Sequence, residues 1–174
     1  TIVKTDFKFA IIDPKRDWAR AMNKLCSDDA YITLLAEKAI SYIKQGRCPL
    51  IIGDRVDMLK KLQKLIPNSI CVIGESSTEI REDALEGLGT TYKAILTTKL
   101  FDEGISCHRL DTIYLTCPGN NEAKLEQRIG RIQREHVDAK HPLVVDFWLA
   151  GSIVQAQQRN RSEWYVRNNF QIQN

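Results

Sequence analysis

A ten-residue segment carries the side chains most able to do chemistry: residues 125–134 read LEQRIGRIQR. At about 100° per residue of α-helix, three aliphatic side chains of this segment share one side and three polar side chains share the other. The aliphatic set is Leu125, Ile129 and Ile132, and the polar set is Gln127, Arg131 and Arg134. Two guanidinium groups one turn apart repel each other unless a multiply charged anion, such as a γ-phosphate, lies between them. The segment therefore predicts an amphipathic helix with a phosphate-binding side.

Gly130 lies beside the polar side of this helix. A glycine inside a helix costs about 1 kcal/mol relative to alanine, and the cost is justified where another molecule must approach the backbone closely. Its position thus favours a ligand over a merely solvated helix. The alternative is a surface helix whose arginines form salt bridges with Glu126 and Glu135.

From about Ala30 onward, helical and strand-like segments alternate. The expected strands are apolar throughout, which indicates a parallel sheet covered on both faces. We predict strands at 49–53, 70–73, 92–97, 112–115 and 143–147, and helices at 29–44, 55–66, 78–85, 122–133 and 152–166. The fold class is therefore α/β: an open parallel sheet with helices on both faces, in three α/β/α layers.

Small and hydroxyl residues follow the expected strands. Gly53 and Arg55 come after the first strand, Gly74 follows the second, and Thr97 and Thr98 close the third. In an open parallel sheet, ligands bind outside the carboxyl ends of the strands, where backbone N–H groups can face an anion. These strand tips suit phosphates, but ordinary turns use the same residue types.

Composition narrows the class of protein. A length of 174 residues suits one compact domain, and 43% hydrophobic with 27% charged residues excludes disordered and fibrous classes. The formal charge of +3 neither requires nor excludes a polyanionic partner. Five cysteines without a C-x-x-C pair argue against a zinc site and a disulfide framework. We predict thiols in a reducing environment and no metal site in this chain.

No run approaches the roughly 18 apolar residues of a membrane span, and the first ten residues do not resemble a secretion signal. We therefore expect no membrane partner and a cytoplasmic location, the host cytoplasm if the source is a virus. The chain begins with Thr1 rather than methionine, which favours a piece of a longer polypeptide. Residues 1–28 are less regular, with an extended stretch at 3–12, and we predict them as a lead-in or linker from a missing first motor domain. Residues 29–174 are then the folded domain with a C-terminal helical extension.

Three segments resemble motifs of superfamily-two helicases. They are Gln127 to Arg134 (motif VI, Q-R-x-G-R-x-x-R), Ala94 to Thr98 with Gly104 to Ser106 (motif V), and Leu50 to Gly53 (motif IV). Gly74 and Arg81 also have the spacing common in the strand, loop and helix that follow motif IV. The similarity covers about 32–147 and implies the second, C-terminal RecA-like domain of such an enzyme. The G-I-S form of motif V is most similar to phage-type and XPB-like DNA helicases.

The resemblance implies an ATP-dependent helicase or translocase, with ATP and Mg²⁺ between two RecA-like domains. The chain contains neither G-x-x-x-x-G-K-[ST] nor D-E-x-[DH], so the first domain would cradle the phosphates and hold Mg²⁺. By resemblance, Arg131 and Arg134 are arginine fingers, and Gln127 places the γ-phosphate or the attacking water. Gly104 and Ser106 would border the nucleotide, where many family members carry a ribose-binding aspartate instead of Ser106. We expect the isolated chain to be inactive.

By the same resemblance, Thr97, Thr98 and Arg55, with the backbone at Gly53 and Gly74, would hold one nucleic-acid strand. Single- or double-stranded DNA is the favoured partner, RNA is the alternative, and no oligomer is implied. Aromatic and basic residues at 155–167 either form a second single-strand platform or pack the last helix on the sheet. The alternative for the whole chain is a non-catalytic helicase-like module that binds nucleic acid or another protein.

Overall fold

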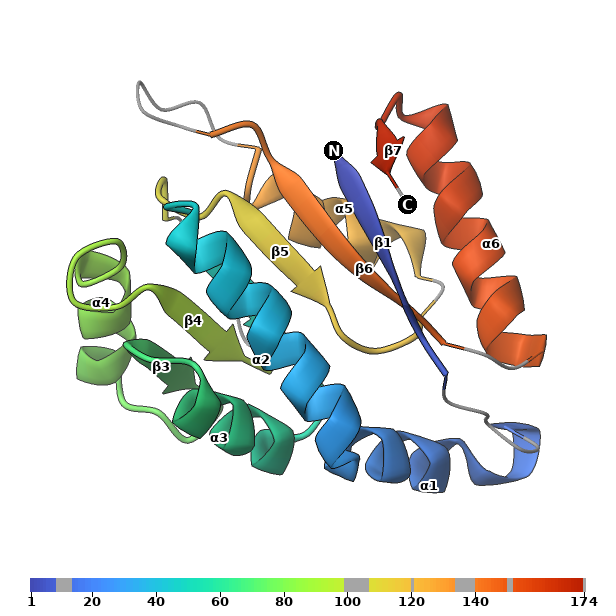
Figure 1. Cartoon of the computed structure of the whole chain (residues 1–174), viewed down its shortest axis with the longest axis horizontal. Helices are drawn as coiled ribbons and strands as arrows, with labels where there is room; N and C mark the ends of the chain where they lie inside the picture. The colour runs from blue at the N-terminus through green and yellow to red at the C-terminus, as the bar shows by residue number, and fades with distance from the viewer. Residues whose placement is uncertain (9–13, 99–106, 120, 134–139, 150–151, 174) are drawn as a thin grey trace.

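A parallel sheet forms the centre of the domain (Figure 1). This computed structural model describes residues 1–8, 14–98, 107–119, 121–133, 140–149 and 152–173. Within them the sheet has seven strands in the order β3-β4-β2-β5-β6-β1-β7, and every neighbouring pair is parallel. The strands are β1 (Ile2–Phe7), β2 (Pro49–Ile52), β3 (Ser69–Val72), β4 (Ala94–Thr97), β5 (Thr112–Leu115), β6 (Leu143–Leu149) and β7 (Ile172–Gln173).

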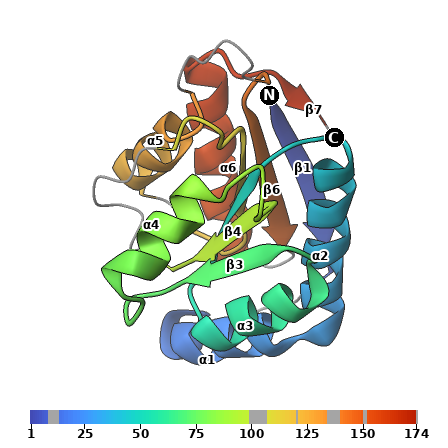
Figure 2. The same cartoon turned by 90° about the vertical axis from the view of Figure 1, so that its left-hand side faces the viewer.

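Helices cover both faces of this sheet, as the two views show (Figures 1 and 2). One face is packed by α1 (Pro14–Ser27), α2 (Asp29–Lys44) and α3 (Val56–Leu65), and the other by α4 (Thr78–Glu86), α5 (Glu122–Gly130) and α6 (Ser152–Arg167). The predicted three-layer α/β/α fold is confirmed. No helix in this described part of the chain is both long enough and apolar enough to cross a membrane.

Alternation along the central strands divides the core into two clusters. Ile51 packs with α1 to α3, whereas its neighbours Leu50 and Ile52 pack with the helices of the opposite face. All four residues of β2 are buried, which explains why this strand reads as a continuous apolar run. On the α2 face, the ring of Phe147 lies 5.8 Å from that of Tyr31 and 5.9 Å from that of Tyr114.

The first 28 residues form part of this domain body. β1 lies between β6 and β7, and Ile2 has no exposed surface. α1 buries Met22 and Leu25 against α2 and the sheet. The prediction of a lead-in outside the folded domain is therefore corrected, because β1 hydrogen-bonds along the whole of β6. Its expected extended stretch ends at Phe7, and residues 9–13 lie outside those described.

Two helix ends test the expected boundaries. α2 has the predicted limits, and the side chain of Asp28 caps it by accepting the backbone N–H of Tyr31 at 2.9 Å. α5 ends at Gly130, three residues before the predicted end. The N–H groups of Arg131 and Ile132 instead donate to carbonyls three residues earlier, at 3.2 and 3.0 Å, so the last turn is tightened.

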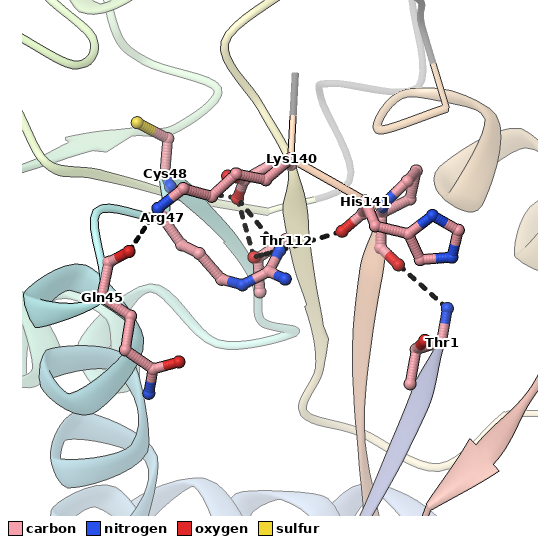
Figure 3. A network of polar contacts seen from close by, with 9 residues as sticks. Thr1, Gln45, Arg47, Cys48, Thr112, Lys140 and His141 are labelled. Atoms are coloured by element: carbon pink, nitrogen blue, oxygen red, sulfur yellow. Dashed lines mark hydrogen bonds and ion pairs between the residues drawn. The ribbon is translucent and has the colours of Figure 1, made fainter. Parts of the chain in front are cut away.

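Polar groups at the amino end of the sheet satisfy one another (Figure 3). Arg47 Nη1 donates to Thr112 Oγ1 at 3.4 Å and to the carbonyl of His141 at 3.0 Å. Asp111 Oδ1 accepts the hydroxyl of Thr112 at 2.8 Å and the backbone N–H of Cys48 at 3.1 Å. The carboxylate also lies 3.9 Å from Arg47 Nη1. This amino-edge network joins the starts of β2, β5 and β6.

Candidate functional site

The carboxyl ends of β2 and β5 lie at the point where the connections change sides. The chain leaves β2 for α3 on one face and leaves β5 for α5 on the other. Because β2 and β5 are adjacent, a crevice forms between their diverging ends, which is where open α/β sheets bind ligands. The residues predicted from the strand tips gather along this carboxyl edge.

Gly53, at the tip of β2, provides room for α3. A Cβ atom there would lie 2.5 Å from Met58 Cε and 2.8 Å from Leu59 Cδ2, so a side chain would have to displace the ends of these two α3 side chains. Its backbone N–H donates to the carbonyl of Thr97 at 2.9 Å, so it is used within the sheet edge. The anion-facing N–H groups that we expected at Gly53 are therefore better sought at the start of α3.

The N-terminus of α3 differs from those of α2, α4 and α5. Side chains of Asp28, Ser77 and Asn121 cap those three helices, whereas the N-cap residue of α3, Arg55, makes no side-chain capping bond. Arg55 Nε instead donates to Asn23 Oδ1 at 2.6 Å, and Nη1 donates to the Asp54 carbonyl at 3.0 Å. An uncapped helix start offers backbone donors and a positive dipole end to an anion.

The two threonines at the end of β4 have different environments. Thr97 is fully buried, and its hydroxyl has no hydrogen-bond partner. Thr98 follows it and is half-buried at the edge of the sheet. Of the two threonines predicted to contact nucleic acid, only Thr98 has an exposed surface, whereas Thr97 is fully buried. Gly104 and Ser106 lie outside the described residues.

Gly74 is exposed in the turn after β3. Its carbonyl accepts Arg81 Nη2 from α4 at 3.2 Å, so the glycine and arginine that were matched by spacing contact each other. Ser76 Oγ accepts the N–H of Ile73 at 3.0 Å and stabilises the same turn. The turn is therefore held in place from α4.

The aliphatic side of α5 lies as the sequence predicts, facing the core. Leu125, Ile129 and Ile132 are buried in the core cluster of this face. Gln127 is exposed, and Arg131 is half-buried at the C-cap of the helix. A Cβ atom on Gly130 would meet nothing within 4 Å, so packing within the chain does not require a glycine there. Arg134 lies outside the described residues.

A cavity of about 210 Å³ opens beside this helix, in the crevice between β2 and β5. Its lining includes Asp54 and Cys117 from the strand tips, Lys124 and Arg128 from α5, and Arg161 from α6. Arg128 Nε is buried and has no hydrogen-bond partner. Arg128 has no predicted role in the site, although the helical wheel places it about 60° from Leu125, at the border of the core side.

Arg161 connects this cavity to the core through a buried ion pair. Its Nη2 lies 2.7 Å from Asp146 Oδ1, and Nη1 donates to the carbonyl of Cys117 at 3.3 Å. The hydroxyl of Tyr165 donates to Asp146 Oδ2 at 3.0 Å. Burial raises the pKa of Asp146, and the charge of Arg161 opposes that rise. The pair fixes α6 against β6, and Arg161 also binds the second residue after β5.

The aromatic residues of α6 belong to the core. Trp164 is 7% exposed and Tyr165 is fully buried, and the ring of Trp164 stacks on that of Phe170 at 5.6 Å between centroids. Neither ring can stack on a base, so the packing interpretation of 155–167 holds. Asp146 is a carboxylate inside an apolar strand, where a buried charge needs a partner, but nothing in the local sequence identifies Arg161 as that partner.

A family model described as "Helicase conserved C-terminal domain" matches residues 31–136, more than half of the chain. The chain belongs to this family. Its fold is that of the C-terminal RecA-like domain of superfamily-two helicases, as the resemblance of the three motifs implied.

Two viral relatives support the assignment. The "Probable helicase D10" of Escherichia phage T5 is 28% identical over 159 residues, which are 88% of this chain and 35% of the relative. The "Putative helicase 22" of Sulfolobus islandicus filamentous virus is 28% identical over 153 residues, 82% of this chain and 27% of the relative. The chain thus spans about a third of the length of the curated relatives it matches.

Solved helicase structures share the fold. The structure of T4 UvsW superposes with a TM-score of 0.77 at 17% identity, covering 99% of this chain and 40% of that protein. The C-terminal domain of the DEAD-box protein Dbp5 gives a TM-score of 0.60 at 13% identity, covering 83% of this chain and 82% of that domain. The part of this chain that superposes on UvsW includes β1 and α1, which agrees with a domain that starts before residue 28.

Proposed function

We propose that this chain is the second motor domain of an ATP-dependent DNA helicase or translocase, acting beside an N-terminal RecA-like domain of the same polypeptide. Family membership supports the general helicase function. The observation that carries the finer proposal is the arrangement of α5. Its aliphatic side is buried, whereas Gln127 and Arg131 lie outside the core beside the open space over Gly130.

The outer side of α5 fits the phosphate end of a nucleotide. Arg131 is half-buried, so a phosphate beside it interacts through less water than at a fully exposed cation. ATP, with Mg²⁺ held by the first domain, supplies the phosphoryl group that is transferred. Arg131 and Arg134 stabilise the charge that develops on the phosphoryl oxygens, and Gln127 orients the attacking water. Gly104 and Ser106 border the nucleotide.

The strand tips bind the backbone of one DNA strand in this proposal. The start of α3 supports it, because side chains cap α2, α4 and α5, whereas the N-cap residue of α3 makes no side-chain capping bond. Arg55 adds a positive charge at the same point. Thr98 and the turn at Gly74 contact neighbouring phosphates, with Gly53 and Thr97 supporting the edge from behind.

Steady-state ATPase measurements on the polypeptide with both motor domains test the roles of the arginines. Arg131→Ala and Arg134→Ala should each lower ATP turnover on the order of 10³-fold or more, because arginine fingers contribute about that factor. Arg131→Lys should restore little, since a point charge does not reproduce the fork of donors. The fold should survive, because the buried side of α5 is unchanged.

Arg167→Ala is the matched control. Arg167 Nη2 pairs with Glu122 at 2.7 Å, and both side chains are more than half exposed, at 61% and 51%. Such a surface pair contributes about 0–1 kcal/mol to stability and nothing to the chemical step, so turnover should stay near wild type. Near-normal turnover in both finger variants would contradict the proposal and leave α5 as a salt-bridged surface helix.

A further inference from the structure

Two of the five cysteine thiols meet although they are far apart in the sequence. The five cysteines are all unpaired thiols. Cys26 lies in the last turn of α1, and Cys117 is the second residue after β5. Their Sγ atoms are 3.9 Å apart, across 91 positions of sequence. No other two cysteines, all of which lie in the described residues, come within hydrogen-bond distance of each other.

The two sulfurs differ in access. Cys26 is 4% exposed and lies beneath the surface. Cys117 is half-buried and lines the cavity that also contains Arg128 and Lys124. A small solute can therefore reach Cys117 from the cavity, with Cys26 directly behind it.

Hydrogen bonds also distinguish the two thiols. Either thiol can donate in the contact between Cys26 Sγ and Cys117 Sγ, and the hydroxyl of Thr116 lies 3.6 Å from Cys117 Sγ. The contact with Cys26 lowers the pKa of Cys117, while the same contact and burial raise the pKa of Cys26. The accessible sulfur is thus the one with more thiolate character, the form that attacks oxidants. By contrast, burial raises the pKa of the half-buried Cys71.

We propose that Cys26 and Cys117 are a redox modification site, which hydroperoxides convert to an intramolecular disulfide. The Cys117 thiolate attacks the hydroxyl oxygen of the hydroperoxide, the O–O bond breaks, and hydroxide leaves from hydrogen peroxide, or alkoxide from an organic hydroperoxide, which gives a sulfenic acid at Cys117. The sulfur of Cys26 then attacks that of Cys117. The S–S bond forms, the sulfenic hydroxyl leaves with the thiol proton as water, and both sulfurs have been oxidised by one peroxide.

The bond requires only a local movement. A disulfide is about 2.05 Å long, so the sulfurs must approach by about 2 Å, which rotation of the two side chains and a small shift of the segment after β5 can supply. That segment leads into α5, and Arg161 already holds the Cys117 carbonyl. Oxidation would therefore fasten α1 to the segment that positions α5.

Peroxide titration of the reduced chain, followed by thiol alkylation and tryptic mapping without reductant, tests this site. The five cysteines fall on five different tryptic peptides, and the expected product joins peptide 25–38 to peptide 110–124. The peptide 65–81, with Cys71, should remain alkylated. Thermal denaturation should show a higher Tm for the oxidised form, since the crosslink constrains the unfolded chain.

Three variants sharpen the result. In the Cys26→Ser variant, oxidation should stop at a sulfenic acid on Cys117, which dimedone traps. In the Cys117→Ser variant, Cys26 should remain a thiol and be alkylated. The Cys71→Ser variant should form the same crosslink as the wild-type chain. If peroxide produces no 25–38 to 110–124 crosslink in the wild-type chain, or oxidises Cys71 as fast as Cys117, the proposal is wrong. This readout is independent of ATP and DNA, so its outcome is separate from that of the proposed function.

Discussion

Buried polar groups at the two ends of the sheet differ in their hydrogen bonding. At the amino end, Arg47, Asp111 and Thr112 are bonded to one another and to backbone groups (Figure 3). At the carboxyl end, Thr97 Oγ1 and Arg128 Nε are buried without hydrogen-bond partners. A satisfied network stabilises the fold, whereas unsatisfied buried donors cost free energy unless another molecule supplies partners. The contrast is in line with the proposal that the carboxyl edge binds a ligand, whereas the amino edge stabilises the fold.

The largest effect on stability should come from the buried pair beneath the carboxyl edge. Arg161→Ala leaves Asp146 charged and buried, which should lower the free energy of unfolding by about 3–5 kcal/mol. The double variant Arg161→Met with Asp146→Leu should recover most of that loss, because a hydrophobic replacement removes both charges. Urea denaturation measures the free energy of unfolding of the single and the double variant. A loss below about 1 kcal/mol in the single variant would show that the pair does not anchor this edge.

A matched pair of threonine substitutions tests the difference between the edges directly. Thr112→Val removes a hydroxyl that bonds Asp111 and Arg47, and should destabilise the chain by about 1–2 kcal/mol. Thr97→Val removes a buried hydroxyl without a partner, and should leave stability unchanged or raise it. Both side chains are fully buried, so the comparison is balanced. Equal losses, measured by urea denaturation, would remove the contrast between the two edges.

The smallest effect concerns DNA binding by the isolated domain. We expect weak binding to single-stranded DNA with a steep salt dependence, because counterion release dominates such contacts. Arg55→Ala should weaken binding a few-fold and reduce the slope of log K against log[salt] by about 0.7. Lys64→Ala, at the other end of α3, is the control and should change neither. Fluorescence anisotropy at several salt concentrations measures the affinity and its salt dependence for each variant. An affinity that is independent of salt would argue against phosphate contacts at this edge.

The sequence predicted the layered fold and one side of α5 well, because both depend on local periodicity. The apolar runs of β2 and β5 and the capped α2 could be placed from their own residues. β1 and α1 were missed as parts of the domain, because β1 mixes polar and apolar residues and is defined by pairing with β6, more than 130 residues later. Asp146 and Arg161 were missed for the same reason, since no local pattern indicates a long-range ion pair.

The sequence predicted which residues lie at the carboxyl edge, but it did not predict which groups they contact. Gly53 was expected to present a backbone donor, yet its N–H bonds to the Thr97 carbonyl and its missing side chain makes room for α3. Arg128 was given no role in the site, yet it lines the cavity there. In both cases a contact from another element decides the role, and residue type and spacing carry no information on that contact.

ATP hydrolysis by this chain alone, compared with the two-domain polypeptide, tests the central claim most directly. The claim is that the carboxyl edge and α5 supply one half of an ATP site, because the sequence contains no phosphate-binding loop of the G-x-x-x-x-G-K-[ST] type. With saturating ATP, Mg²⁺ and single-stranded DNA, the isolated chain should show no turnover above background, and the two-domain polypeptide should show DNA-stimulated turnover that Arg131→Ala abolishes. DNA-stimulated hydrolysis by the isolated chain, or its absence from the two-domain polypeptide, would contradict the claim.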